Sequence, residues 1–331
     1  MSIDVHNHLF AADLLDEIDG ALVERRGKAA SMDQFYEGED LSFTTEGPDR
    51  RVELMDEWGL DRAVLSFPSP ESFIDEQYLS DPEIYGEFAR LVNDYLAEAS
   101  DRHPDRLLGF ASVPLVDTDA AITELDRALD DLGLQGVGLD TNVFGASLID
   151  EQFRAFFEHA DDRGVPIFVH PTNPLGKDRL QRFYTESMIG FPMETTVMVA
   201  EMIFSGFVEQ YDDLEIILSH LGGAIPYLKR RMEFLYSPED PEFDRHRIAD
   251  LSREPSSYLD RFWYDTSQTY PRAMEMAYDL VGDRLIFGSD YPFGPTDSVP
   301  TTMDQLDVVG LDDDVRERVD YGHAEDILLN L

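Results

Sequence analysis

The chain opens with Ile3-Asp4-Val5-His6-Asn7-His8, a short β-rich run that ends in two histidines one residue apart. In a strand, residues i and i+2 lie on the same face, so we expect both imidazoles to point to one side of a sheet. A His-x-His pair alone is a weak signal, because a buried histidine often has only a structural role. The ends of the other strands decide what this pair means.

Seven further apolar runs follow, separated by segments with the periodicity of helices. The predicted strands are residues 3–8, 62–67, 107–114, 137–143, 166–170, 214–220, 262–267 and 284–290. Several are almost continuously hydrophobic, as is typical of parallel strands covered on both faces. Eight β-then-α units predict an α/β fold, a (β/α)₈ TIM barrel in one domain over residues 1–331. A doubly wound open sheet is the alternative, but no G-x-G-x-x-G turn follows the first strand.

Two long segments interrupt the alternation of strands and helices. Residues 9–48 follow the first predicted strand, and residues 233–258 follow the sixth. Both insertions begin at the carboxyl end of a strand, where barrel enzymes build their sites. We therefore expect them to form a lid or part of a substrate pocket.

Ionisable residues end three more of the predicted strands. The fifth strand ends in His170, the sixth in His220 and the eighth in Asp290. Stability alone has no use for charged groups gathered at one end of a barrel. These side chains are therefore expected to meet His6 and His8 at the mouth of the barrel.

The predicted cluster has the donors of a metal site. Three imidazoles and one carboxylate suit Zn²⁺, with Mn²⁺ and Fe²⁺ as alternatives. The predicted ligands are His6, His8, His170 and Asp290, which leaves His220 free as a general acid or base. The fourth strand offers no lysine that could bridge a second metal, so we expect a single ion.

The charge of the chain is strongly unbalanced. Asp and Glu number 69 against 26 Lys and Arg among 331 residues, giving a formal net charge of −43 that is spread along the whole length. Such a surface repels itself in dilute buffer, whereas concentrated salt screens the repulsion. This favours a halophilic protein in a salty cytoplasm over an ordinary acidic one. It also argues against nucleic acid as a partner, because phosphate binding needs clustered basic residues.

Two absences narrow the class of protein further. The chain has no cysteine, which excludes disulfides, thiolate ligands and cysteine nucleophiles. No apolar run reaches the roughly 18 residues that a membrane-spanning helix needs, and the first residues lack a basic region and a signal core. The expectation is a soluble, cytoplasmic protein that does not bind membranes.

Four longer motifs point to a family. They are FVHP at 168–171, GFPMET at 190–195, SHLGGAIP at 219–226 and GSDYPF at 288–293. With them, the chain resembles the amidohydrolase-related family that includes aminocarboxymuconate-semialdehyde decarboxylase, from Asp4 to Ala324. The resemblance implies a barrel of the metal-dependent hydrolase type that holds one zinc ion, with the sixth-strand histidine as catalytic base. These roles fall on His6, His8, His170 and Asp290 for the metal and on His220 for the base.

Two arginines extend the resemblance. Arg51 begins the stretch RVELMD, which is similar to the arginine-bearing helix before the second strand in this family. The resemblance implies that Arg51 binds a substrate carboxylate, to which a guanidinium is well matched. The alternative is a solvated surface arginine beside Arg50. Arg231 also matches a family arginine, for which we expect a structural role.

The chain departs from the decarboxylase in two places. Thr172 and Asn173 stand where the decarboxylase has an aromatic residue after its fifth-strand histidine. The acidic loop 237–242 replaces a region that supplies a second carboxylate-binding arginine across a dimer interface. These departures do not affect the resemblance to the family. They leave open the exact substrate and whether the chain forms a homodimer.

Three functions are compatible with this sequence. The favoured one is a metal-dependent carboxy-lyase, a decarboxylase of a small unsaturated or aromatic carboxylate, with His220, Asp290 and Arg51 as catalytic residues. The alternative is a hydrolase of a lactone, amide or ester, in which Asp290 or His220 moves the proton. The third is a non-catalytic binding barrel, against which the five ionisable residues argue. For His103, His159, His246 and His323 we expect surface or capping roles.

Overall fold

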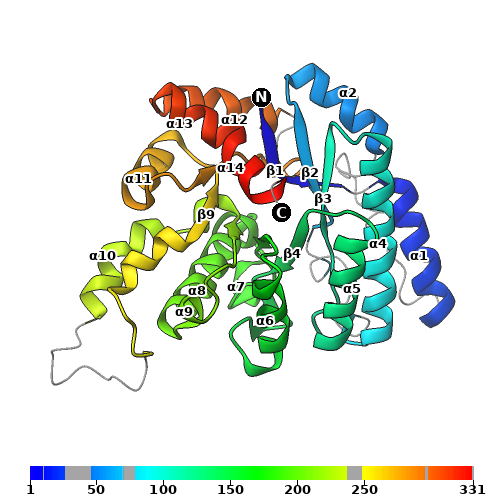
Figure 1. Cartoon of the computed structure of the whole chain (residues 1–331), viewed down its shortest axis with the longest axis horizontal. Coiled ribbons are helices and arrows are strands. Elements are labelled where there is room, and N and C mark those ends of the chain that lie inside the picture. The colour runs from blue at the N-terminus through cyan, green and yellow to red at the C-terminus, as the bar shows by residue number, and fades with distance from the viewer. Residues whose placement is uncertain are drawn as a thin grey trace.

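Eight short parallel strands form the centre of the structure, and helices surround them (Figure 1). The computed structural model describes residues 1–9, 11–26, 46–68, 70, 79–236, 248–294 and 297–329. The strands are β1 (Ile3–His8), β2 (Arg62–Ser66), β3 (Leu107–Ala111), β4 (Gly136–Asp140), β7 (Ile167–His170), β8 (Ile216–Leu218), β9 (Phe262–Asp265) and β10 (Leu285–Ile286). They lie side by side in chain order from β1 to β10. Each predicted strand contains the core of an observed one, and the predicted barrel is confirmed.

Backbone hydrogen bonds close the barrel between β1 and the segment after β10. Val5 N donates to Phe287 O at 3.0 Å, Asp290 N to His6 O at 2.8 Å, and His8 N to Tyr291 O at 2.7 Å. The first strand is thereby joined to the last, so the ends of the chain's eight strands surround one mouth.

The interior of the barrel is filled by side chains rather than by solvent. One layer contains Val5, Phe110, Phe168, Ile217 and Ile286, all at most 1% exposed. Helix α14 (His323–Leu328) packs against this layer and lies near the centre of the ring beside β1 in Figure 1. Since this end is packed with apolar side chains, the open end with the polar cluster is the one left for a site.

The outer helices begin where the sequence supplies caps. Helix α4 (Pro82–Arg102) starts after Asp81, whose carboxylate accepts from Glu83 N at 3.1 Å. Helix α5 (Thr118–Asp130) starts after Asp117, which accepts from Ala120 N at 3.0 Å. Such caps satisfy backbone donors that the first turn leaves unpaired. The other helices are α1 (Ala12–Arg26), α2 (Pro48–Trp58), α6 (Arg154–Asp162), α7 (Lys177–Leu180), α8 (Phe191–Phe204), α9 (Phe207–Gln210), α10 (Ile225–Leu235), α11 (Pro271–Val281), α12 (Ser298–Val308) and α13 (Asp313–Glu317).

Parts of the two predicted insertions lie within the described residues. Helix α1, from the 9–48 insertion, lies beside α4, where Tyr95 Oη donates to Asp13 Oδ1 at 2.8 Å (Figure 1). Residues 10 and 27–45 lie outside the described residues, as do residues 237–247 of the second insertion. The expected lid role of both insertions stays a prediction. None of the helices in the described ranges is both long and apolar enough to cross a membrane.

The fourth predicted strand, residues 137–143, was too long. Strand β4 ends at Asp140, and β5 (Asn142–Val143) pairs instead with β6 (Ala146–Ser147) as a small antiparallel hairpin. Asn142 accounts for the change of direction, because its side chain accepts from Gly145 N at 2.8 Å and closes the turn.

Candidate active site

Four of the predicted site residues meet at the mouth of the barrel. One side-chain donor atom from each of His6, His8, His170 and Asp290 lies within 4.8 Å of the others. His6 and His8 are fully buried, and Asp290 is 3% exposed. The extended backbone of β1 turns both of its histidines to the same side, and His170 is the last residue of β7. The structure therefore brings together the four side chains that the sequence suggested as ligands, and their role as ligands stays a prediction.

The distances within this cluster favour a cation at its centre. His6 Nε2 lies 3.0 Å from His8 Nε2 and 2.9 Å from Asp290 Oδ1, and His8 Nε2 lies 3.3 Å from the same oxygen. Two neutral imidazole nitrogens and a carboxylate oxygen facing one another this closely repel unless a proton or a metal ion lies between them. The donor set and its convergence both fit a divalent metal.

Burial and the neighbouring charges shift the pKa values of all four residues in the cluster. Burial lowers the pKa of His6, but the charges of Asp290 and Asp265 outweigh it and raise the pKa to about 10. Burial, with the neighbouring His6, lowers the pKa of His8 to about 4 and also lowers that of His170. The pKa of Asp290 is lowered despite its burial, because the imidazoles surround it. The carboxylates thus hold positive charge at this position, whichever cation supplies it.

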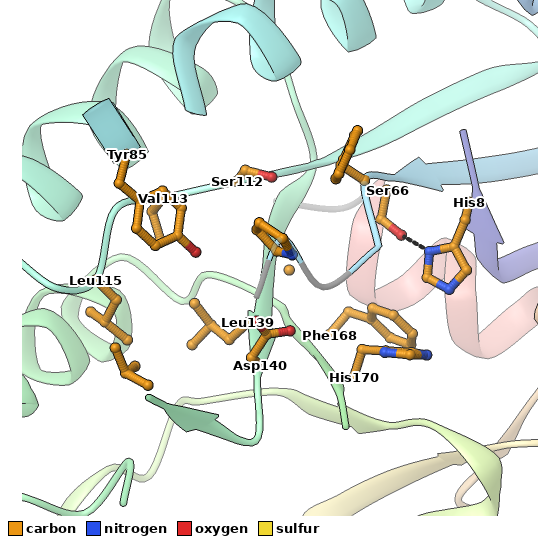
Figure 2. Close-up of a pocket in the computed structure, with 14 residues that line it drawn as sticks. His8, Ser66, Tyr85, Ser112, Val113, Leu115, Leu139, Asp140, Phe168 and His170 are labelled. Carbon is orange, nitrogen blue, oxygen red and sulfur yellow. Dashed lines mark hydrogen bonds between the residues drawn. The ribbon is translucent and has the colours of Figure 1, made fainter. Parts of the chain in front are cut away.

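Asp265 orients His6 and was missed by the sequence reasoning. Its Oδ2 lies 2.6 Å from His6 Nδ1, and Ser267 Oγ lies 3.1 Å from the same nitrogen. The ring is thereby fixed with Nε2 facing the cluster. Ser66 does the same for His8, with its Oγ 2.9 Å from Nδ1 (Figure 2). Such partners set the tautomer and the angle of a ligating imidazole. Asp265 is the last residue of β9, and the predicted end at Ser267 concealed it.

The sequence predicted that His220 and Asp290 end strands, and this prediction is wrong. Strand β8 ends at Leu218 and β10 at Ile286. His220 has a φ of 51° and Asp290 a φ of 61°, which is left-handed backbone that cannot continue a strand. Strained backbone of this kind is held in place only by the surrounding structure and gathers at functional sites.

The turn that carries His220 depends on glycine. Leu221, Gly222 and Gly223 continue the left-handed run with φ values of 57°, 69° and 65°. A Cβ at Gly223 would overlap the carbonyl oxygen of Pro192, at the start of α8. Glycine therefore allows both the backbone conformation and the close packing of this turn against α8.

His220 is the fifth predicted residue at the site. Its Nε2 lies 3.1 Å from Asp290 Oδ2, and its backbone N donates to Ser267 Oγ at 3.3 Å. Gln268, another residue that the sequence did not suggest, donates from Nε2 to Asp290 Oδ2 at 2.5 Å. Asp290 thus faces the histidine cluster through Oδ1 and faces His220 and Gln268 through Oδ2.

Arg51 lies in a different environment from either of those expected. It is 1% exposed, so the surface alternative is wrong. Its Nε donates to Glu46 Oε1 at 2.5 Å, Nη1 to the side chain of Asn7, and Nη2 to His8 O at 2.8 Å. The guanidinium carbon lies 4.7 Å from the centre of the Tyr291 ring. Arg51 is not among the described residues that line either cavity at the site.

A buried carboxylate continues this polar network behind the cluster. Asp4 is fully buried and accepts from Ser289 Oγ at 2.6 Å, Asn7 Nδ2 at 2.7 Å and His6 N at 3.1 Å. The network runs from Ser289, next to Asp290, through Asp4 and Asn7 to Arg51. It ties the end of β1 to the turn that carries the aspartate of the cluster.

Two cavities of unequal size adjoin the cluster. The larger has a volume of about 1060 Å³, with His170, His220 and Asp290 in its wall. The smaller has a volume of about 30 Å³ and lies on the side of β2, β3 and β4, where Figure 2 shows Ser66, Ser112 and Asp140 around it. His170 borders both. The cluster therefore separates a large space from one that holds only a few water molecules.

The other predicted residues lie away from the cluster. His103 caps α4 through its backbone N, which donates to Ala99 O, and its Nε2 lies 2.7 Å from Asp49 Oδ1 on α2. His159 Nε2 lies 2.7 Å from Asp126 Oδ1. His323 is buried rather than on the surface, with Nδ1 2.8 Å from Leu285 O. Arg231 is exposed on α10, and the structural role expected for it stays a prediction. His246 lies outside the described residues.

The fold and the cluster together define a barrel with a metal-binding site at the carboxyl ends of its strands. A family model described as amidohydrolase matches residues 3–328, so the chain belongs to the amidohydrolase family, as the motifs had indicated.

The chain is also similar to individual relatives. It is 30% identical over 254 residues to a 2-amino-3-carboxymuconate-6-semialdehyde decarboxylase of Dictyostelium discoideum, covering 76% of this chain and 68% of that one. It is 32% identical over 264 residues to a gamma-resorcylate decarboxylase of Rhizobium radiobacter, covering 74% and 76%. A solved dihydroxybenzoic acid decarboxylase of Polaromonas sp. JS666, with bound manganese and the inhibitor 2-nitroresorcinol, matches with a TM-score of 0.76. It is 25% identical, over 98% of this chain and 96% of that one.

Proposed function

We propose that the protein is a metal-dependent carboxy-lyase that removes CO₂ from a small aromatic carboxylate. The observation that carries this proposal is His220 beside the four-donor cluster at the base of a cavity large enough for an aromatic ring. The relatives described above are all named as decarboxylases, two of them for hydroxylated benzoates, and they support the same reaction.

In this proposal His6, His8, His170 and Asp290 hold one divalent ion. The donor set suits zinc, which is our first candidate, and manganese, which the Polaromonas relative binds, is the competing one. When bound, the ion supplies positive charge that holds the anionic substrate and stabilises the charge that develops during the reaction. Asp265 and Ser66 keep the two β1 imidazoles aimed at it.

His220 moves the proton. Loss of CO₂ requires a proton on the ring carbon that bears the carboxylate, after which the carbon–carbon bond breaks and its electron pair restores the ring. His220 lines the cavity with its Nε2 3.1 Å from Asp290 Oδ2, which holds the imidazole beside the cluster, where it can donate the proton. Asp290 and Gln268 hold the orientation of the histidine and of each other.

For Arg51 we propose a positioning role in place of the expected contact with a substrate carboxylate. Each of its three nitrogens already has a protein acceptor, one of which is the carbonyl oxygen of His8. By fixing that carbonyl and Asn7, Arg51 sets the position of β1 beside the metal.

The same residues also suit the alternative, a hydrolase of a lactone, amide or ester, because a metal and a proton-transfer group serve both reactions. One experiment separates them. The metal-loaded enzyme is incubated in molar KCl with aromatic acids, unsaturated acids, lactones and amides, and CO₂ release is scored against ring opening or amine release. Release of CO₂ from a hydroxylated benzoate supports the lyase, ring opening alone supports the hydrolase, and inactivity towards every compound supports a binding barrel.

We also propose that two copies of the chain pack together around the rim of the large cavity. Four large side chains that line this cavity are at least 63% exposed: Tyr184, Met188, Tyr227 and Tyr270. Phe183, next to Tyr184 in the chain, and Phe234, on the same helix as Tyr227, are also exposed. Lys177, Arg179 and Arg182 are exposed and lie within seven residues of Tyr184 in the chain. Two chains of charge −43 repel least where apolar and basic residues gather. Light scattering in molar KCl should give a dimer that Tyr184→Ser weakens and Val308→Ser, on α12, does not.

A further inference from the structure

The large cavity exceeds the needs of a single hydroxylated ring. Its volume of about 1060 Å³ is slightly above the roughly 300–1,000 Å³ that sites for drug-sized ligands occupy. A benzoate held against the cluster by its carboxylate would reach only the part nearest His220 and Asp290. The remaining volume needs an occupant that the proposed reaction alone does not supply.

The small cavity cannot take up the rest of the substrate. Its volume of about 30 Å³ corresponds to two or three water molecules, and Figure 2 shows side chains around it on the β2, β3 and β4 side of His170. Any substituent larger than a hydroxyl group must therefore extend into the large cavity, away from β4.

The wall of the large cavity is apolar where it leaves the catalytic residues. Phe191, Leu221, Met276 and Phe293 line it, together with Met188. Methionine side chains adapt to apolar shapes of different outline. Such a wall stabilises hydrocarbon by excluding water from it and offers little to a hydroxyl or methoxy group.

Several polar groups in this wall are already paired within the protein. Gln268 Nε2 donates to Asp290 Oδ2 and to Phe293 O, and Thr269 Oγ1 donates to Ser267 O at 2.7 Å. Arg272 pairs with Glu275 at 2.5 Å. The tyrosines at positions 184, 227 and 270 are at least 72% exposed and belong to the rim. A polar substituent that reached these groups would have to break their pairs, whereas an apolar substituent would leave the pairs in place.

We propose that the substrate is an aromatic carboxylate with a bulky apolar substituent, either an alkyl chain or a second aromatic ring. This inference rests on the proposed decarboxylation, since that reaction sets the carboxylate against the cluster. The substituent extends from the ring along Phe191, Leu221 and Met276 towards the rim. A second copy of the chain covers the rim without filling this inner part.

A series of substrates tests the inference. The metal-loaded enzyme in molar KCl is given a series of 2-hydroxybenzoates. Each carries hydrogen, methyl, butyl or phenyl at the ring position para or meta to the carboxylate, and CO₂ release is measured. We expect kcat/KM to rise about threefold to fourfold for each methylene until the cavity is filled. A flat or falling series with release of CO₂ from the unsubstituted ring overturns the inference and leaves the proposed reaction standing.

Binding measured without turnover separates the two proposals. Nitro analogues, in which a nitro group replaces the carboxylate, are titrated by calorimetry across the same substituents. If no compound releases CO₂, the proposed reaction fails, but affinity that rises with the apolar group still supports the cavity assignment. Equal affinity across the series overturns it.

Variants locate the effect in the cavity. Met276→Gln, in the wall, should lower the ratio of kcat/KM for the butyl compound to that for the unsubstituted ring by about tenfold. Val308→Gln, on α12 outside the cavity and 67% exposed, should leave this ratio unchanged. If the two variants give the same ratio as the parent, the substituent does not lie against α11.

Discussion

At the scale of single residues, we assign different roles to two neighbours, with Asp290 as a metal ligand and His220 as the group that transfers the proton. Asp290 Oδ1 faces the three imidazoles, whereas Oδ2 faces His220 Nε2 at 3.1 Å. If His220 moves the proton and does not hold the metal, His220→Asn should keep one ion per chain and lower kcat by about 10²–10⁴-fold. Metal content by mass spectrometry and turnover are the two measurements. Loss of the ion from His220→Asn would make His220 a ligand and require a different model of the site.

Asp265 allows a test of how the protein tunes its metal site. Asp265→Asn keeps the shape of the side chain but removes the charge that orients His6 Nδ1 at 2.6 Å. Since outer partners of a ligating histidine contribute about 10–100-fold to metal affinity, we expect a loss of that size. Competition with a chelating dye measures it. Ser267→Ala, which removes the weaker contact at 3.1 Å, is the matched control and should lose less.

Arg51 distinguishes positioning from substrate binding. Arg51→Met removes the donors to His8 O and Asn7 and leaves Glu46 without its cation, which should cost about 3 kcal/mol of stability together with weaker metal binding. Arg51→Lys should also lose stability and metal affinity, because lysine cannot reach three acceptors at once. Its loss should be smaller, because it keeps a positive charge beside Glu46. Chemical unfolding and metal titration give the result. A raised KM with unchanged metal affinity would instead favour the substrate contact implied by the family resemblance.

The sequence could predict those residues of the site that lie at or next to the ends of strands. His8 and His170 end observed strands, and His6 lies two residues before His8 on the same face of β1, so strand periodicity alone brought these three together. Asp265 also ends an observed strand. It was missed because Thr266 and Ser267, which follow it, were included in the predicted strand. The partners of Arg51 could not be inferred, because Tyr291 and Glu46 are 245 residues apart and meet only when the barrel closes.

At the scale of elements, composition located all eight strands but not their ends. The predicted strands at 214–220 and 284–290 run two and four residues past the observed ends at Leu218 and Ile286. Hydrophobic composition does not record the sign of φ, and it is the left-handed backbone at His220 and Asp290 that brings these side chains over the mouth. Irregular turns at strand ends therefore account for most of the difference.

The turn after β8 yields a prediction of its own. Gly223→Ala should destabilise the protein and lower turnover, because the added Cβ overlaps Pro192 O and must displace either α8 or the turn with His220. Gly282→Ala is the control: its φ of 70° is also left-handed, but a Cβ there meets no atom within 4 Å. That variant should cost only the backbone strain, about 1–3 kcal/mol, and leave turnover intact. Equal unfolding midpoints and equal turnover in the two variants would contradict the packing argument.

At the scale of the whole molecule, the excess of 69 acidic over 26 basic residues decides how the protein responds to salt. Many described arginines are already paired, as Arg163 is with Asp126 and Asp130. Surface pairs contribute at most about 1 kcal/mol each, and the unpaired carboxylates repel one another across the surface. Salt weakens both effects, but the unbalanced charge of −43 makes the loss of repulsion the larger one.

We therefore predict that the thermal unfolding midpoint rises strongly from dilute buffer to molar KCl at pH 7. The screening distance falls from about 10 Å at 0.1 M salt to about 3 Å at 1 M, so most of this rise should occur below 1 M. The control uses the sequence pI of about 4.2, because the same salt series near that pH meets a chain with almost no net charge. If repulsion between carboxylates is the cause, the midpoint there should change little with KCl, whereas a general strengthening of hydrophobic burial by salt would act at both pH values. Calorimetry at the two pH values gives the two slopes. A flat response at pH 7, or equal slopes at both, would contradict the proposal that this acidic surface is an adaptation to a salty cytoplasm.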